Sequence, residues 1–116
     1  MAAPNVINIT NLTCKSAVAN LTTATGNIIT SAANTVIKVN DIILSNYTAN
    51  SVTANILFNR SSTGYYVAGN VSLPAYSSLV VIGKDSPIYL EEGDVLQANV
   101  SANSAVHMTS SYEIVT

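Results

Sequence analysis

The chain offers few side chains for catalysis, because it contains one histidine, one cysteine and one arginine. His107 stands at a polar position of an alternating stretch, which predicts a solvent-facing side chain. A nucleophile pair of Cys14 and His107 would require the fold to join residues about ninety positions apart. A single histidine also leaves no multi-histidine metal site within one chain. We therefore expect no catalytic residue, no metal site and no cofactor.

Four of the six acidic residues form a cluster within ten positions: Asp85, Glu91, Glu92 and Asp94. Calcium takes its oxygen ligands from a compact loop, whereas Tyr89 and Leu90 interrupt this cluster. Two interpretations follow, a weak calcium site and a solvated turn that keeps a sheet edge soluble. We favour the second, and predict a structural turn with Gly93 at positive φ, formed by Glu91, Glu92, Gly93 and Asp94.

Aromatic residues supply another candidate site, since the chain has six tyrosines: Tyr47, Tyr65, Tyr66, Tyr76, Tyr89 and Tyr112. Tyrosines gathered on one surface would form a platform on which carbohydrate rings stack. Aromatic residues near strand ends more commonly cap a core or anchor an interface with a hydrogen-bonding tip. Packing is therefore the preferred interpretation.

The composition is poor in charge, with 9% charged and 48% hydrophobic residues and a net charge of −2. Four scattered basic residues form no stripe that would neutralise phosphates, so we expect no nucleic-acid binding. The longest strongly apolar run is residues 79–82, much shorter than a membrane-spanning helix requires. Serine, threonine and asparagine make up 40 of the 116 residues, and these types favour turns and strands over helix interiors.

Apolar and polar residues alternate along much of the chain, which is the pattern of half-buried strands. Strands are predicted over residues 18–21, 26–30, 52–59, 65–68, 78–82, 87–90, 95–101 and 106–114. Residues 35–44 are apolar on both faces, which predicts a deep strand that is covered on both sides or carries a bulge. Two hairpins are expected, turning at residues 60–64 and 103–104. Pro74 predicts a bend or an edge, because proline has no N–H to donate.

Short alternating strands between regularly spaced turn signals are typical of an all-β sandwich. We expect a single antiparallel β-sandwich of jelly-roll-like form over residues 15–116, preceded by an extended N-terminal arm over residues 1–14. The arm would insert its apolar residues into a groove of its own sandwich or of a neighbouring subunit, by strand addition. These predicted partner-binding residues are Val6, Ile7, Ile9 and Leu12.

Three segments also carry a family resemblance: residues 71–82, the run DSPIYLEEGD at residues 85–94, and SSYEI at residues 110–114. They resemble the small virion structural proteins of tailed bacteriophages, particularly of aquatic and marine phages. The resemblance covers most of residues 15–116 and implies a compact all-β module that is incorporated into the virion and has no enzymatic activity. The chain departs from the pattern of this family at two places, the short loop at residues 60–64 and the pair His107 and Met108. Both places lie on surfaces that would decide which partner is bound.

Composition and resemblance together lead us to expect a capsid decoration (cement) protein, because a nearly uncharged surface docks at low desolvation cost. Two alternatives stay open: a neck, tail, baseplate or fibre-base component of the virion, and a carbohydrate-binding β-sandwich module. Expected partners are the major capsid protein or another virion protein and further copies of the chain, with a homotrimer favoured by the three-fold positions of capsid lattices. The expected location is the virion, assembled in the cytoplasm of a bacterial host.

Overall fold

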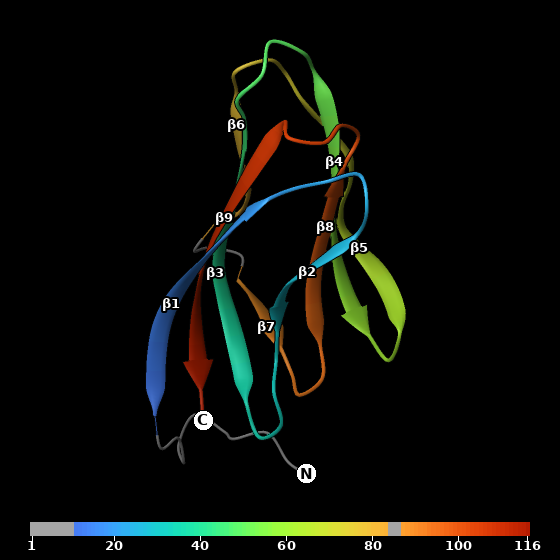
Figure 1. Ribbon diagram of the computed structural model, residues 1–116. Coiled ribbons are helices and arrows are strands. Elements are labelled where there is room, and N and C mark those ends of the chain that lie inside the picture. The colour runs from blue at the N-terminus through green and yellow to red at the C-terminus, as the bar shows by residue number, and fades with distance from the viewer. Residues whose placement is uncertain (1–10, 84–86) are drawn as a thin grey trace.

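The computed structural model describes residues 11–83 and 87–116, and every regular element in this part of the chain is a β-strand (Figure 1). Nine strands follow one another here: β1 (Leu12–Asn20), β2 (Gly26–Thr30), β3 (Val36–Asn46), β4 (Val52–Arg60), β5 (Thr63–Leu73), β6 (Ser78–Ile82), β7 (Ile88–Leu90), β8 (Val95–Val100) and β9 (Val106–Val115). Described residues 11–83 and 87–116 contain no helix, and so none that is long and apolar enough to cross a membrane. The predicted all-β class is confirmed.

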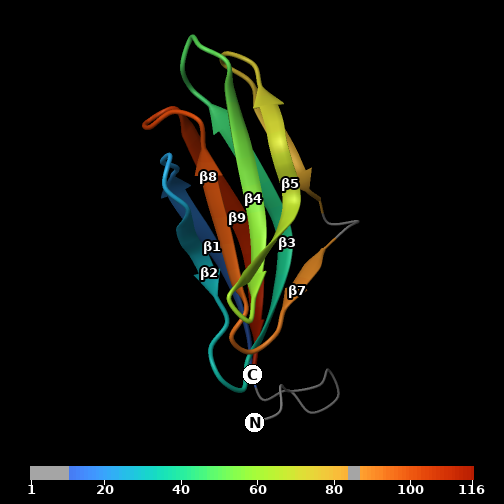
Figure 2. The ribbon, with the colours of Figure 1, turned by 90° about the vertical axis from the view of Figure 1, so that its right-hand side faces the viewer.

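The strands form two antiparallel sheets that pack face to face, with sheet B in front of sheet A in Figure 2. Sheet A has the order β1-β9-β3-β6, and β7 also pairs with β3. Sheet B has the order β2-β8-β4-β5. Because β6 and β7 border successive parts of β3, they occupy one strand position between them. The resulting two sheets of four positions have the strand order of a jelly roll, which confirms the predicted sandwich.

Strand β3 lies at the centre of sheet A, as its apolar sequence predicts. It pairs with β9 along its whole length and with β7 and β6 on its other side. The ladder with β9 shifts by one residue between Val39 and Asp41, so this strand carries the bulge that was one of its two predicted forms. At the bulge, the Asp41 carboxylate accepts a hydrogen bond from the Ser111 N–H at 3.0 Å.

One of the two predicted hairpins is confirmed and the other is wrong. Strands β4 and β5 pair through a two-residue turn, in which Ser61 and Ser62 both have positive φ, as a type I′ turn requires. Strands β8 and β9, in contrast, belong to different sheets. The connection after Val100 therefore crosses the gap between the sheets. Alternation shows which side chains of a strand face inward, but it does not show which sheet the strand joins.

The boundary predicted between arm and sandwich also needs correction. Residues 12–14 belong to β1, where Leu12 lies opposite Val115 and Cys14 lies opposite Glu113. Apolar arm residues Val6, Ile7 and Ile9 lie outside the described residues. Pro74 ends β5 and opens a turn in which Ser77 N donates to Pro74 O at 3.2 Å, so the predicted bend is confirmed.

The core lies between the sheets and is built from inward-facing apolar side chains of both. Its largest fully buried members include Ile42 and Leu44 of β3, Ile56 of β4 and Leu96 of β8. A buried polar residue, Asn46, closes one end of this core. Its Nδ2 donates to the carbonyl oxygens of Asn50, Leu73 and Pro74 at 2.8, 3.0 and 3.2 Å, and its Oδ1 accepts from the N–H and hydroxyl of Thr48. One amide therefore ties the end of β3 to the end of β5.

Candidate functional site

Cys14 and His107 both lie on sheet A, but the fold does not bring them together. Cys14 is exposed on β1, with its Sγ 3.9 Å from Glu113 Oε1. His107 lies on β9 opposite Asn20, and its ring centroid is 4.3 Å from that of Tyr47. Since the two positions are six residue steps apart along the β1–β9 ladder, they are roughly 20 Å apart. These two side chains therefore cannot form a nucleophile and base pair.

The acidic segment forms the predicted turn between β7 and β8. Gly93 has φ +84°, as predicted, and Asp94 N donates to Glu91 O at 3.0 Å. The turn is also attached to the neighbouring loop, because Gly93 N donates to Ser31 O at 2.9 Å and the Glu92 carboxylate accepts from Asn34 N. Asp85 lies outside the described residues. Among the described residues, no three His, Cys, Asp or Glu side chains gather as metal ligands would.

Arg60 forms salt bridges with two acidic residues of this turn, Glu91 and Asp94, and we call these three residues the clamp. Arg60 comes from the end of β4, and its Nε and Nη2 donate to the two carboxylate oxygens of Asp94 at 2.9 and 2.6 Å. Nη2 also donates to Glu91 at 2.7 Å. The sequence-based view of a solvated turn is therefore wrong for Asp94, whose side chain is only 4% exposed. The signal available in the sequence was the single arginine at the end of a predicted strand.

The clamp shifts the pKa of both partners in the directions expected for an ion pair. Burial alone would raise the pKa of Asp94, but the hydrogen bonds from Arg60 and from the backbone N–H of Glu91 outweigh it and hold that pKa below its ordinary value. The hydrogen bond to Asp94 likewise raises the pKa of Arg60. The turn thus joins the β4–β5 hairpin to the β7–β8 connection, which is a structural role.

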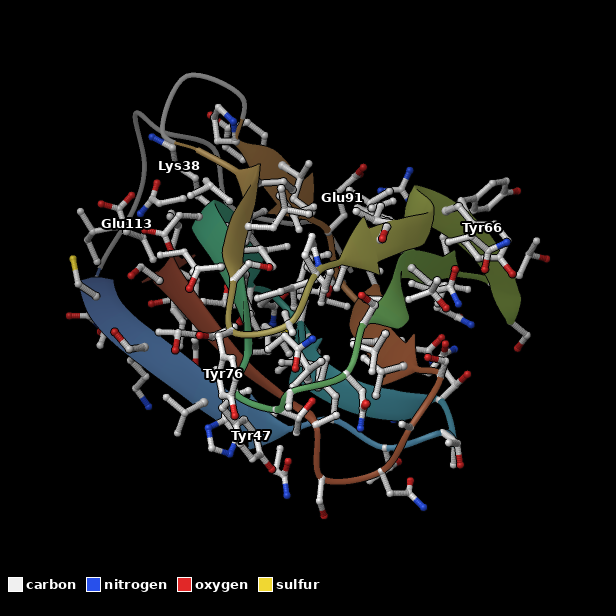
Figure 3. All side chains as sticks on the ribbon, turned by 90° about the horizontal axis from the view of Figure 1, so that it is seen from above. Lys38, Tyr47, Tyr66, Tyr76, Glu91 and Glu113 are labelled. Atoms are coloured by element: carbon white, nitrogen blue, oxygen red, sulfur yellow. The ribbon has the colours of Figure 1, made fainter. Side chains whose placement is uncertain are left out.

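The tyrosines do not form a single platform. Tyr47 and Tyr76 lie on neighbouring loops, since Tyr76 N donates to Thr48 O at 3.1 Å. Tyr89 lies on sheet A opposite Lys38, and Tyr112 packs half-buried against the core. Figure 3 shows Lys38 and Glu113 on one side of the molecule and Tyr66 on the opposite side, beyond sheet B. Tyr65 and Tyr66 are both exposed on β5, but they lie on opposite faces of sheet B, because Tyr65 is opposite Phe58 and Tyr66 is opposite Leu57.

The outer face of sheet A carries an exposed row of apolar and methyl-bearing side chains. Strand register places Val18 opposite Thr109, Thr109 opposite Ile43, and Ile43 opposite Val80. We call these four residues the apolar row. Val18 is 78% exposed and Val80 is 59% exposed. The next rows on either side consist mostly of small polar side chains. One row contains Asn20, His107, Ser45 and Ser78, and the other contains Ser16, Ser111 and one acidic residue, Asp41.

The apolar row ends at β1, the edge strand of sheet A. Asn11 and Thr116 exchange two backbone hydrogen bonds, and Leu21 N donates to Val106 O, so odd-numbered residues of β1 bond to β9. The even-numbered residues therefore direct their N–H and C=O groups toward the open edge: Leu12, Cys14, Ser16, Val18 and Asn20. No described strand pairs with this edge. Leu12, a predicted partner-binding residue, is the first residue of β1 and is 53% exposed.

The outer face of sheet B is covered by amide side chains that hydrogen-bond across the strands. In the first amide row, Asn59 Nδ2 donates to Gln97 at 3.4 Å, and Gln97 Nε2 donates to Asn27 at 2.8 Å. In the second amide row, Asn55 Nδ2 donates to Asn99, and Asn99 Nδ2 donates to the Thr25 hydroxyl, both at 2.8 Å. This face was not predicted from the sequence, because pairing between strands decides which amides meet.

Comparisons with known proteins do not assign this chain to a family. No protein-family model matches the chain, and no curated protein matches it. The jelly-roll order alone does not assign a function either, because the same fold serves unrelated ones. The features of this chain that bear on function are therefore the two sheet faces and the open edge of β1.

Proposed function

We propose that this protein is a non-enzymatic structural component of a tailed-phage virion, and that its first role is capsid decoration. The observation that supports this proposal best is the apolar row on the outer face of sheet A. Burying Val18, Ile43 and Val80 against a partner removes apolar area from water. The flanking rows contain mostly neutral side chains, so docking costs little desolvation.

The open edge of β1 supplies a second kind of contact. Five residues offer unpaired backbone groups to any added strand, and Lys15 is the only charged residue of β1. Residues 1–10 lead directly into this strand and contain Val6, Ile7 and Ile9. In our proposal, the arm of one copy pairs with a neighbouring copy, and the copies form a closed symmetric oligomer, with a trimer favoured.

Many identical weak contacts suit a protein that covers a shell. Even where each copy buries only a modest area, a linked oligomer docks several copies at once and gains affinity through effective concentration. The proposed partner is the major capsid protein. A neck, tail, baseplate or fibre-base position is the alternative address in the virion, because it would use the same face and edge with fewer copies.

Cryo-electron microscopy of purified particles of the phage that encodes the chain tests this proposal. Decoration predicts density for the sandwich at many symmetry-related positions over the shell, with sheet A toward its partner. Density at the neck or tail alone would support a role in the virion but would show that the position is not the capsid surface. Particles that contain no copy of the chain would contradict the proposal.

A further inference from the structure

The outer face of sheet B has the chemistry of a ligand surface, and it lies on the side of the sandwich opposite to the apolar row. Arg60 is the only charged residue in the four strands of sheet B, and its guanidinium is turned toward Asp94 and Glu91. The remaining outward side chains are amides, hydroxyls and three apolar or aromatic residues: Leu57, Tyr66, and Val95, which lies opposite Asn59. These strands offer no unpaired charge to a charged ligand, whereas their amides and hydroxyls suit a neutral polar ligand.

Both amide rows are oriented in the same direction. In each row the donor lies nearer to β5 and the acceptor nearer to β2, from Asn59 to Asn27 and from Asn55 to Thr25. Aligned hydrogen bonds polarise one another, which holds the amides in fixed orientations. The second row is anchored at its other end, because Asn55 Oδ1 accepts from the backbone N–H of Asn70 at 2.7 Å.

The aligned rows keep unused hydrogen-bonding capacity. Each side-chain amide has two N–H donors and two acceptor lone pairs, and the bonds within the rows use only part of them. Asn27 Nδ2 donates no bond within its row, and Asn59 Oδ1 accepts none. Groups that both donate and accept at fixed positions are complementary to hydroxyl groups, which also do both.

An apolar patch lies beside the rows. Leu57 of β4 lies opposite Gln97 on one side and opposite Tyr66 on the other, so it stands between the amides and the tyrosine. Tyr66 is 68% exposed, and its ring packs beside Gly69, where an added Cβ would lie 3.6 Å from the ring. The negative face of an aromatic ring attracts the weakly positive C–H groups of a sugar.

The edge strand β5 is irregular at this place. Its ladder with β4 shifts twice, around Ile56, and Asn70 has φ +49°. Bulges of this kind occur often beside binding sites, because they change the direction of a side chain. They also hinder the addition of a further strand to this edge, which disfavours a second copy of the chain as the occupant.

From these observations, we propose that the outer face of sheet B binds a neutral glycan, with Tyr66 stacking against a sugar ring and the two amide rows binding its hydroxyls. The site spans four strands, or roughly 14 Å, so the ligand is an oligosaccharide or polysaccharide chain rather than one sugar. This activity is separate from virion incorporation through sheet A, and either proposal can fail without the other.

An array of neutral and acidic bacterial oligosaccharides, followed by calorimetry on the bound members, tests the site. We expect binding to neutral glycans that persists when NaCl is raised from about 0.05 to about 0.5 M, because no charge takes part. Tyr66→Ala should weaken this binding about tenfold, and Asn99→Ala should weaken it severalfold. The matched control Val80→Ala, an exposed change on sheet A, should leave it unchanged.

Circular dichroism and thermal unfolding of each variant separate loss of binding from loss of fold. Four results would overturn the proposal: no neutral glycan retained by the folded protein, binding only to acidic glycans that salt removes, equal binding by the folded Tyr66→Ala variant, or a dimer in sedimentation that Tyr66→Ala dissociates. The last result would assign the face to a second copy of the chain.

Discussion

The outer faces of the two sheets come from similar alternating sequences but differ in how they meet solvent. On sheet B, outward amides hydrogen-bond to side chains of neighbouring segments, Gln97 to Asn27 and Asn99 to Thr25, and keep further donors and acceptors for a polar ligand. On sheet A, Val18 and Val80 stand largely exposed beside a strand edge that no described strand covers. Alternation therefore sets which side chains face outward, and their chemistry sets what each face can bind.

Substitution of Asn46 should cause the largest loss of unfolding free energy, because its amide joins the end of β3 in sheet A to the end of β5 in sheet B. Asn46→Ala leaves the carbonyl oxygens of Asn50, Leu73 and Pro74 without their donor, and we expect it to cost about 3 kcal/mol of unfolding free energy. Urea denaturation measures this loss. Asn50→Ala, an exposed change nearby, is the control and should stay within about 0.5 kcal/mol. Equal losses of unfolding free energy for the two variants would show that the Asn46 side chain does not stabilise this end of the sandwich.

The Arg60–Asp94 clamp should come next, and its contribution should depend on pH. The folded-state pKa of Asp94 lies below its ordinary value of 3.8, so the unfolded chain takes up the proton first as the pH falls. The unfolding free energy should therefore be level above about pH 5 and decline as the pH falls below 3.8 toward the folded-state value. Asp94→Asn should cost about 2 kcal/mol at pH 7 and flatten this acid dependence.

Urea denaturation of both proteins at a series of pH values measures this effect. An Asp94→Asn protein with the same acid dependence as the unchanged protein would assign that dependence to other carboxylates.

The smallest effects should distinguish the two faces directly. Asn55→Ala on sheet B removes the bond to Asn99 and the acceptor for the Asn70 N–H, and should cost about 1 kcal/mol of unfolding free energy. Val18→Thr on sheet A changes a side chain that is 78% exposed and should stay within about 0.5 kcal/mol. Thermal unfolding measures both changes. A larger loss for Val18→Thr would mean that the apolar row already packs against something within the chain.

The sequence predicts most of the strands, because burial on one side of a sheet leaves a period of two, but it predicts only the end of β1 and the middle of β5. It also predicts the Gly93 turn and the hairpin at Ser61 and Ser62, since turns depend on neighbouring residues. It does not predict that β8 and β9 lie in different sheets, because a strand alternates in the same way wherever it pairs. The jelly-roll order depends on contacts between segments far apart in the chain.

The candidate sites were less predictable than the strands. The clamp joins Arg60 to Asp94 although three strands separate them in the chain, and the amide rows depend on the register of β2, β8 and β4. The sequence does not distinguish Asn46 from the thirteen other asparagines, and only the structure shows that it is buried. In each case the deciding fact is which distant side chain lies opposite, and composition and periodicity contain no such information.

Incorporation of matched charge variants into particles tests the central claim most directly. Val18→Asp places one negative charge in the apolar row, and Asn27→Asp places the same charge on sheet B. We predict that the Val18→Asp protein is largely lost from purified particles, whereas the Asn27→Asp protein is incorporated at the copy number of the unchanged chain, as quantitative mass spectrometry would measure. Equal incorporation of two folded variants would contradict the assignment of sheet A as the docking face, and absence of the unchanged chain from particles would contradict the virion role itself.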